Sequence, residues 1–70
     1  MKKIISILTP TFNEEDNVQE LYNRVKSVTS KIRKYNFEHI FIDNHSQDST
    51  VKKIKRIILK DKSVKLIVNS

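Results

Sequence analysis

Two short polar segments carry the side chains that could bind a ligand. The first, 9–15, reads TPTFNEE and holds Glu14, and the second, 43–50, reads DNHSQDST and begins with Asp43. Carboxylate oxygens can accept the hydroxyl and N–H hydrogens of a ribose and a base. Each segment directly follows an apolar run, so we expect both at strand ends. The sequence therefore predicts one carboxylate-rich cleft built from two separate segments.

Apolar spacing predicts the elements that must position these segments. Apolar runs predict strands at 4–8, 39–42 and 64–68, and we expect the first to be buried on both faces and to end at Pro10. Apolar residues at helical spacing predict a helix over 14–34, with Asn13 as its cap and acidic side chains in its first turn. A second helix is expected to begin at Asp48 as its cap.

Strands and helices that alternate with short connections indicate right-handed crossovers. We therefore expect an α/β fold with three parallel strands in the order third, second, first. In such a sheet 9–14 and 43–46 lie side by side at the carboxyl ends of adjacent strands. This arrangement places Glu14 and Asp43 on opposite walls of one cleft.

Composition excludes several classes of protein. The chain has 70 residues, enough for one domain, and contains neither glycine nor cysteine. Rossmann and P-loop phosphate sites and serine nucleophile elbows need glycine, and disulfides and thiolate zinc sites need cysteine. The apolar start is too short for a signal peptide or a membrane span, which favours a cytoplasmic protein.

The formal net charge of +6 comes mostly from the second half of the chain. The cations there alternate with apolar residues in a helical rhythm, which is typical of the solvated face of a helix, and a face toward phosphates or a membrane is the alternative. No aromatic residues are interleaved with them, so we expect no nucleic-acid partner. These cations are Lys52, Lys53, Lys55, Arg56, Lys60, Lys62 and Lys65.

The polar segments resemble two motifs of family 2 glycosyltransferases. PTFNEE at 10–15 resembles the P-x-Y-N-E-E opening of that family, especially in polyprenyl- and dolichyl-phosphate sugar synthases. IDNHSQDST at 42–50 is similar to its V-D-D-G-S-x-D-G-T turn. The resemblance covers nearly the whole chain and implies an A-type, Rossmann-like glycosyltransferase fold. Residues 1–70 would be the amino-terminal part of its nucleotide-sugar-binding domain.

The resemblance implies a nucleotide-binding role for six residues. Backbone groups of the first two would line the pocket, the aromatic ring would lie near the base or ribose, and the glutamate would accept a ribose or base hydrogen. The last two would hold the base. Turn formation and helix-dipole chemistry are the alternative explanation of these side chains. The six are Pro10, Thr11, Phe12, Glu14, Asp43 and Asn44.

Four residues depart from the family pattern, and one of them is Ser49, which like His45 stands where the family often has glycine. Phe12 lacks the hydroxyl of the common tyrosine, and Asn44 replaces a carboxylate, so both can contact a nucleoside but with fewer or weaker hydrogen bonds. His45 stands where the family often has glycine, so a left-handed backbone there would carry some strain.

The resemblance also implies partners and a cofactor. It implies a nucleotide-diphosphate sugar donor, an acceptor such as a polyprenyl phosphate or a glycan, and a divalent Mg²⁺ or Mn²⁺. The D-x-D metal motif and the catalytic base lie later in the family's sequences, so we expect no catalytic or metal-binding residue in 1–70 and no activity of this segment alone. The full protein is expected in the cytoplasm or at the cytoplasmic face of a membrane.

Two further expectations concern surfaces. The first strand is expected at an exposed sheet edge, which is a template for self-association. The alternative to a glycosyltransferase is a non-enzymatic basic α/β module that binds acidic partners through the lysines of its second helix.

Overall fold

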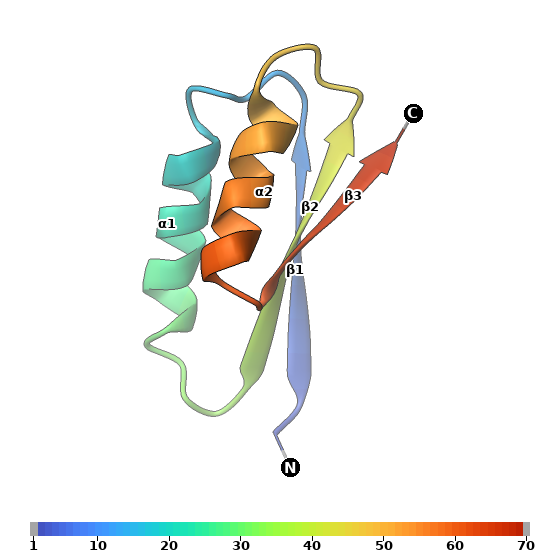
Figure 1. Ribbon diagram of the computed structural model, residues 1–70. Coiled ribbons are helices and arrows are strands. Elements are labelled where there is room, and N and C mark those ends of the chain that lie inside the picture. Colours follow the sequence, from blue (N-terminus) through green and yellow to red (C-terminus); the bar gives the residue numbers. More distant parts are fainter. Residues whose placement is uncertain (1, 70) are drawn as a thin grey trace.

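Strands and helices alternate along the chain in the predicted order. The computed structural model describes residues 2–69, and its elements are β1 (Ile4–Thr11), α1 (Val18–Thr29), β2 (Asn36–Asn44), α2 (Thr50–Lys60) and β3 (Val64–Asn69). The strands pair in parallel in the order β1-β2-β3, with β2 in the centre. This confirms the predicted α/β fold and the order third, second, first (Figure 1).

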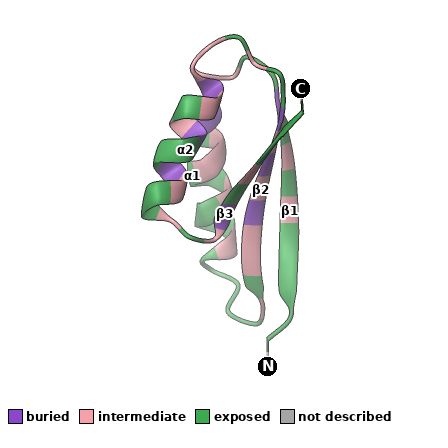
Figure 2. Cartoon of the chain, turned by 45° about the vertical axis from the view of Figure 1, so that its right-hand side comes forward, coloured by how far each residue is buried: buried purple, intermediate pink, exposed green. Residues whose placement is uncertain are grey.

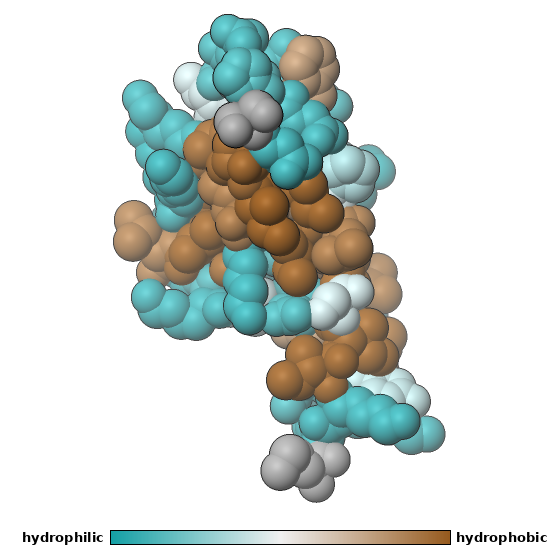
Figure 3. All heavy atoms as spheres, turned by 90° about the vertical axis from the view of Figure 1, so that its right-hand side faces the viewer, coloured by the Kyte–Doolittle hydropathy of each residue, from teal (hydrophilic) through white to brown (hydrophobic). Residues whose placement is uncertain are grey.

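Both helices cover the same face of the sheet (Figures 1 and 2). Two right-handed crossovers that step in the same direction place both of their helices on one side. The prediction that the first strand is buried on both faces is therefore wrong: Ile4 is 67% and Leu8 59% exposed. Figure 3 looks toward the uncovered side, where apolar side chains gather across the middle.

The core lies between the helices and the covered face of the sheet. Phe41 in the central strand is fully buried among side chains from both helices and from β3. Burying each such side chain contributes about 1.5–3 kcal/mol. The core therefore fixes the helices on the sheet and, through them, the loops at the carboxyl ends of the strands. Its other members are Val18, Ile54, Ile57 and Val64.

The first helix is shorter than the predicted range 14–34. Its cap is Asn17, and the N–H groups of Asn17 and Val18 both donate to the Glu14 carbonyl, so 14–17 form a turn. Asn13 has a φ of 51°, outside the extended region that a helix cap adopts, and the prediction of Asn13 as cap is wrong. At the other end the chain leaves the helix after Thr29 because β2 must begin beside the start of β1.

Two smaller boundaries also differ from the predictions. Helix α2 begins at Thr50, and Ser49 rather than Asp48 holds the cap position. The Asp48 carboxylate nevertheless accepts from the N–H of Thr50, the first helical residue, at 2.9 Å. Strand β1 continues through Pro10 to Thr11, because an edge strand leaves one side unpaired and tolerates the missing N–H.

Neither helix between residues 2 and 69 has the length and apolar character to cross a membrane.

Candidate functional site

Two loops meet at the carboxyl ends of β1 and β2, and we call them together the polar edge: residues 12–17 and 45–49. Thr11, the last residue of β1, is paired directly with Asp43, the second-to-last residue of β2. Both loops lie at the same end of the sheet, beside the start of α2 (Figure 1). The structure therefore brings the two predicted polar segments together.

Asp43 is fully buried and ties the two strands to the second loop. Its Oδ1 accepts a hydrogen bond from the Thr11 hydroxyl at 2.8 Å and another from the Ser46 hydroxyl, and its Oδ2 accepts from the Ser46 N–H at 2.8 Å. Burial alone raises the pKa of Asp43, but the hydrogen bonds from Ser46 and Thr11 more than offset this and hold that pKa below its ordinary value. The Asp43 carboxylate is therefore charged, and the protein itself supplies the hydrogen bonds that it accepts.

Asn13 joins the first loop to the second. Its N–H donates to the Ser46 hydroxyl at 2.9 Å, and its side-chain oxygen accepts from the Gln47 N–H at 2.8 Å. The left-handed backbone at Asn13 allows both contacts, and asparagine is one of the few residues that adopts it readily. The next N–H along, that of Glu14, donates to the Thr50 hydroxyl at 2.8 Å. Three consecutive cross-links thus hold the loops in one arrangement.

The N-terminus of α2 is occupied by Glu15. The Glu15 carboxylate accepts from the Ser49 N–H at 3.2 Å, its N–H donates to Asp48 at 3.2 Å, and its carbonyl accepts from the Lys53 ammonium at 2.7 Å. A carboxylate is favoured at a helix N-terminus by the helix dipole. This end of α2 therefore binds the protein's own carboxylate.

The six predicted nucleotide-binding residues fall into two groups. Thr11 and Asp43 are buried and face inward. Pro10, Asn44 and Phe12 are exposed, Phe12 by 56%, and Glu14 is half-buried. The side-chain oxygen of Asn44 accepts from Asn69 at 3.0 Å. Four of the six are thus within reach of a ligand.

An open cleft of about 480 Å³ lies beside the edge strand, between β1 and α1. Pro10 and Glu14 line it, whereas Phe12 and Asn44 do not. The Glu14 carboxylate accepts from the Asn17 amide at 3.2 Å and otherwise faces this space. Arg24 also lines the cleft, and sequence reasoning missed it because its pairing with Glu20 at 2.8 Å is typical of a helix surface.

The backbone at His45 has the left-handed conformation that was considered for this position. Its φ is 63°, a left-handed value that costs a residue with a Cβ more than it costs glycine. The histidine itself is exposed. The second loop therefore contains a left-handed residue that is not glycine.

The described residues do not fit a divalent metal. Across residues 2–69 there is no group of three or more histidine or acidic side chains that could hold an ion. The two oxygens of Asp43 accept hydrogen bonds from the protein. No chemical step is therefore assigned to a metal at this edge.

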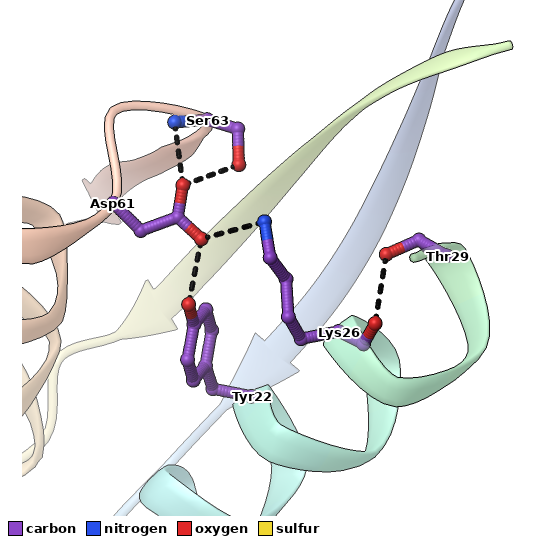
Figure 4. Close-up of polar contacts among 5 residues, drawn as sticks. All are labelled: Tyr22, Lys26, Thr29, Asp61 and Ser63. Carbon is purple, nitrogen blue, oxygen red and sulfur yellow. Dashed lines mark hydrogen bonds and ion pairs between the residues drawn. The ribbon is translucent and has the colours of Figure 1, made fainter. Parts of the chain in front are cut away.

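A second polar cluster lies where α1 meets the link between α2 and β3 (Figure 4). We call this place the opposite end, because it is at the amino end of β3 and the polar edge is at the carboxyl ends of β1 and β2. Asp61 accepts from the Tyr22 hydroxyl at 2.6 Å, pairs with the Lys26 ammonium at 3.1 Å, and accepts from the N–H and hydroxyl of Ser63. The hydrogen bond to Asp61 raises the pKa of Tyr22 to about 12, with help from burial. Burial opposes ionisation of Asp61, but the bonds from Ser63, Tyr22 and Lys26 lower its pKa well below the ordinary value.

His39 lies beside this cluster. It is 4% exposed, its Nε2 is 2.8 Å from the Thr9 hydroxyl, and its Nδ1 is buried with no hydrogen-bond partner. Burial lowers the pKa of His39, and the charge of Asp61 opposes that shift. His39, Tyr22 and Asp61 line a cavity of about 170 Å³. Sequence reasoning missed this cluster because its members belong to no shared motif.

Comparisons with known proteins lead to one family. The family described as Glycosyl transferase family 2 matches residues 6–70. An uncharacterized glycosyltransferase of Bacillus subtilis (strain 168), YkcC, is 34% identical over 62 residues, 89% of this chain and 19% of that protein. An uncharacterized glycosyltransferase of Synechocystis sp. is 30% identical over 63 residues, 90% of this chain and 20% of that protein. A dolichol-phosphate mannosyltransferase of Pyrococcus furiosus is 30% identical over 53 residues, 76% and 14% of the two chains. The chain thus spans a fifth or less of the length of these relatives.

Proposed function

Since the chain belongs to glycosyl transferase family 2, we propose that its polar edge forms the nucleoside-facing wall of a donor site for a nucleotide-diphosphate sugar. The observation that carries the proposal is the half-buried Glu14 beside an open cleft, held there by cross-linked loops. A carboxylate in this setting can accept the hydroxyl hydrogens of a ribose. The cross-links hold it in place before the ligand arrives.

The accessible residues would contact the nucleoside directly. Pro10 supplies a rigid wall, Glu14 accepts a ribose or base hydrogen, and the exposed Phe12 ring offers a face for stacking. Asn44 can accept a base N–H through its carbonyl. Each contact is part of the proposal.

Thr11 and Asp43 would act as positioning residues. Asp43 is buried and accepts three hydrogen bonds from Thr11 and Ser46. It would therefore hold the end of β1 and the second loop in position beside the ligand. A direct contact of Asp43 with the base would require the second loop to move.

The reaction that we propose for the whole protein is transfer of a hexosyl group from the donor to an acceptor. A lipid phosphate is the acceptor class that we favour, because one relative is a dolichol-phosphate mannosyltransferase. The catalytic base and any Mg²⁺ or Mn²⁺ would come from parts of the protein beyond these 70 residues, so this segment alone is proposed to be inactive. We propose that the protein works in the cytoplasm.

Nuclear magnetic resonance titration with uridine and guanosine diphosphate tests the donor site. We expect shifts of the amide signals of 9–15 and 43–47, without added metal. Glu14→Gln should weaken binding by about five- to tenfold, since it removes a charge-assisted hydrogen bond. Asp16→Asn is the matched control, because it removes the same charge from an exposed neighbour. If neither nucleotide shifts these signals in the folded chain, or if both variants bind equally, the proposal is wrong.

We further propose that this chain self-associates through β1, which is hydrogen-bonded on one side only, to β2. An edge strand of eight residues with exposed apolar side chains is a template for pairing. Sedimentation at increasing concentration should show dimers, and Ser6→Lys should reduce them by adding a charge to the strand. Ser27→Lys in exposed α1 is the control. A monomer at all concentrations would contradict this.

A further inference from the structure

The solvent side of α2 presents dense positive charge around one exposed leucine. Leu59 is 77% exposed, the highest fraction among the exposed large hydrophobic side chains of residues 2–69. At 100° per residue Leu59 lies about 20° from Lys52, about 40° from Lys55 on one side and about 60° from Arg56 on the other. Lys60 is the last residue of the helix, about 100° around from Leu59, and Lys62 follows just past the helix end. We call this surface the cationic face, and it consists of Lys52, Lys55, Arg56, Leu59, Lys60 and Lys62.

The charges of the cationic face are not neutralised by neighbours. The ion pairs found within residues 2–69 are Arg24–Glu20, Lys26–Asp61 and Lys65–Glu38, and none involves this face. Nearby carboxylates are engaged elsewhere, Asp61 by Tyr22 and Glu15 by the start of α2. Four exposed cations on about three helical turns, with a fifth, Lys62, just past the end of the helix, therefore remain without an acidic partner among residues 2–69.

We propose that the cationic face docks on the surface of an anionic lipid bilayer. Lysine and arginine side chains near a membrane are attracted by anionic headgroups and can extend to them while their stems lie on apolar surface. An apolar side chain at the centre of such a face enters the boundary between headgroups and acyl chains. Leu59 has that position.

Two other partners fit the cationic face less well. A nucleic acid would use the cations but gain little from Leu59, and the face has no aromatic side chain for base stacking. The centres of protein–protein interfaces are depleted in lysine, whereas lysine dominates here. The combination of flexible cations with a central leucine favours lipid.

Docking through α2 leaves the proposed donor site open. The helix runs alongside the strands, on the covered side of the sheet, and the polar edge lies at their ends (Figures 1 and 2). The cleft is lined by residues of β1, α1 and the first loop, and none of them belongs to the cationic face. Membrane docking and nucleotide binding are thus separate properties of the chain and can be tested apart.

Vesicle co-sedimentation tests the inference. The 70-residue chain should bind vesicles that contain phosphatidylglycerol, bind phosphatidylcholine vesicles weakly, and dissociate as salt is raised. Lys52→Glu combined with Lys55→Glu should lower the affinity at least about tenfold. Lys31→Glu with Lys34→Glu is the matched control, because it changes the net charge equally at exposed positions between α1 and β2. Equal losses in the two double variants would overturn the inference.

Leu59→Ser separates lipid from other polyanions. It keeps every charge, so binding to heparin and to duplex DNA should stay unchanged while affinity for the anionic vesicles falls about threefold or more. If Leu59→Ser leaves vesicle binding intact, or if DNA competes more strongly than vesicles, the face is a general polyanion site and the inference is wrong. Circular dichroism checks that each variant is folded, and Lys→Gln variants replace any Lys→Glu variant that is not. Nucleotide titration of the same variants should show no change in nucleotide affinity.

Discussion

The polar edge and the opposite end each hold a carboxylate that is largely shielded from solvent, and they use it differently. Asp43, at the polar edge, is fully buried and accepts only from uncharged donors, Thr11 and Ser46. Asp61, at the opposite end, has a side chain 12% exposed and accepts from the Lys26 ammonium as well as from Tyr22. One carboxylate fixes two loops, whereas the other fastens α1 to the link between α2 and β3.

The difference shows which end depends more on a single residue. The loops of the polar edge are held by hydrogen bonds between side chains and backbone, and Asp43 is where three of those bonds converge. At the opposite end the packing of Tyr22 against the core and the stacking of its ring on His39 also contribute. Loss of Asp43 should therefore disturb the molecule more than loss of Asp61.

The largest expected effect is that of Asp43→Ala. The change leaves the Thr11 hydroxyl and the Ser46 N–H buried without an acceptor, and we expect the free energy of unfolding to fall by about 3 kcal/mol. Urea denaturation measures it. Asp43→Asn keeps one acceptor oxygen and should cost less. A loss no greater than that of Asp61→Ala would show that the two carboxylates are equivalent.

Asp61→Ala should cost about 2 kcal/mol, because the Tyr22 and Lys26 donors are closer to water and can be solvated. The same change should lower the pKa of Tyr22 from about 12 toward 10.0. Absorbance titration in a Tyr35→Phe background isolates this signal. A Tyr22 pKa that stays near 12 would mean that burial, not Asp61, raises it.

The opposite end should also respond to pH near neutrality. Because the folded pKa of His39 is below its ordinary value of 6.5, the unfolded chain binds more protons, and stability falls as pH drops from about 7 to about 5. The carboxylates Asp43 and Asp61, whose pKa values are also lowered, lose their contribution only below about pH 4. His39→Gln should flatten the thermal-unfolding profile between pH 5 and 7, and an unchanged profile in that variant would contradict this prediction.

The smallest expected effect is a gain at the polar edge. His45→Gly relieves the left-handed backbone and should raise the free energy of unfolding by about 0.5 kcal/mol, since the greater freedom of glycine in the unfolded chain offsets part of the relief. His45→Ala keeps the Cβ and should give no gain. Equal stabilisation by both variants would point to the imidazole rather than to the backbone.

Much of the fold follows from sequence, because apolar periodicity specifies element type and order. The helix-rich half of the core, Val18, Ile54 and Ile57, lies at positions that the spacing predicts. What periodicity does not reveal is which faces of a strand are covered, so the apolar run of β1 was expected to be buried although Leu8 is exposed. Burial of that kind depends on where the crossover helices lie.

The candidate site was predictable in outline only. The meeting of Thr11 with Asp43 follows from parallel pairing. The setting of Asp43 depends on the turn that brings the Ser46 N–H back to its carboxylate. The late start of α1 depends on contacts that Asn13 and Glu14 make with residues more than thirty positions away. Apolar spacing and capping preferences concern residues that are close in sequence, so they do not predict such contacts.

The hydrogen bonds of the polar edge have a consequence for how the chain folds. The bonds from Thr11 to Asp43, from Asn13 to Ser46 and from Glu14 to Thr50 join residues 32, 33 and 36 positions apart. On a ribosome none can form until Asp43 has emerged, and the last must wait for Thr50. Each requires closure of a long loop, which slows folding. During synthesis the first loop therefore lacks these partners at first, and the polar edge takes its final shape as α2 docks.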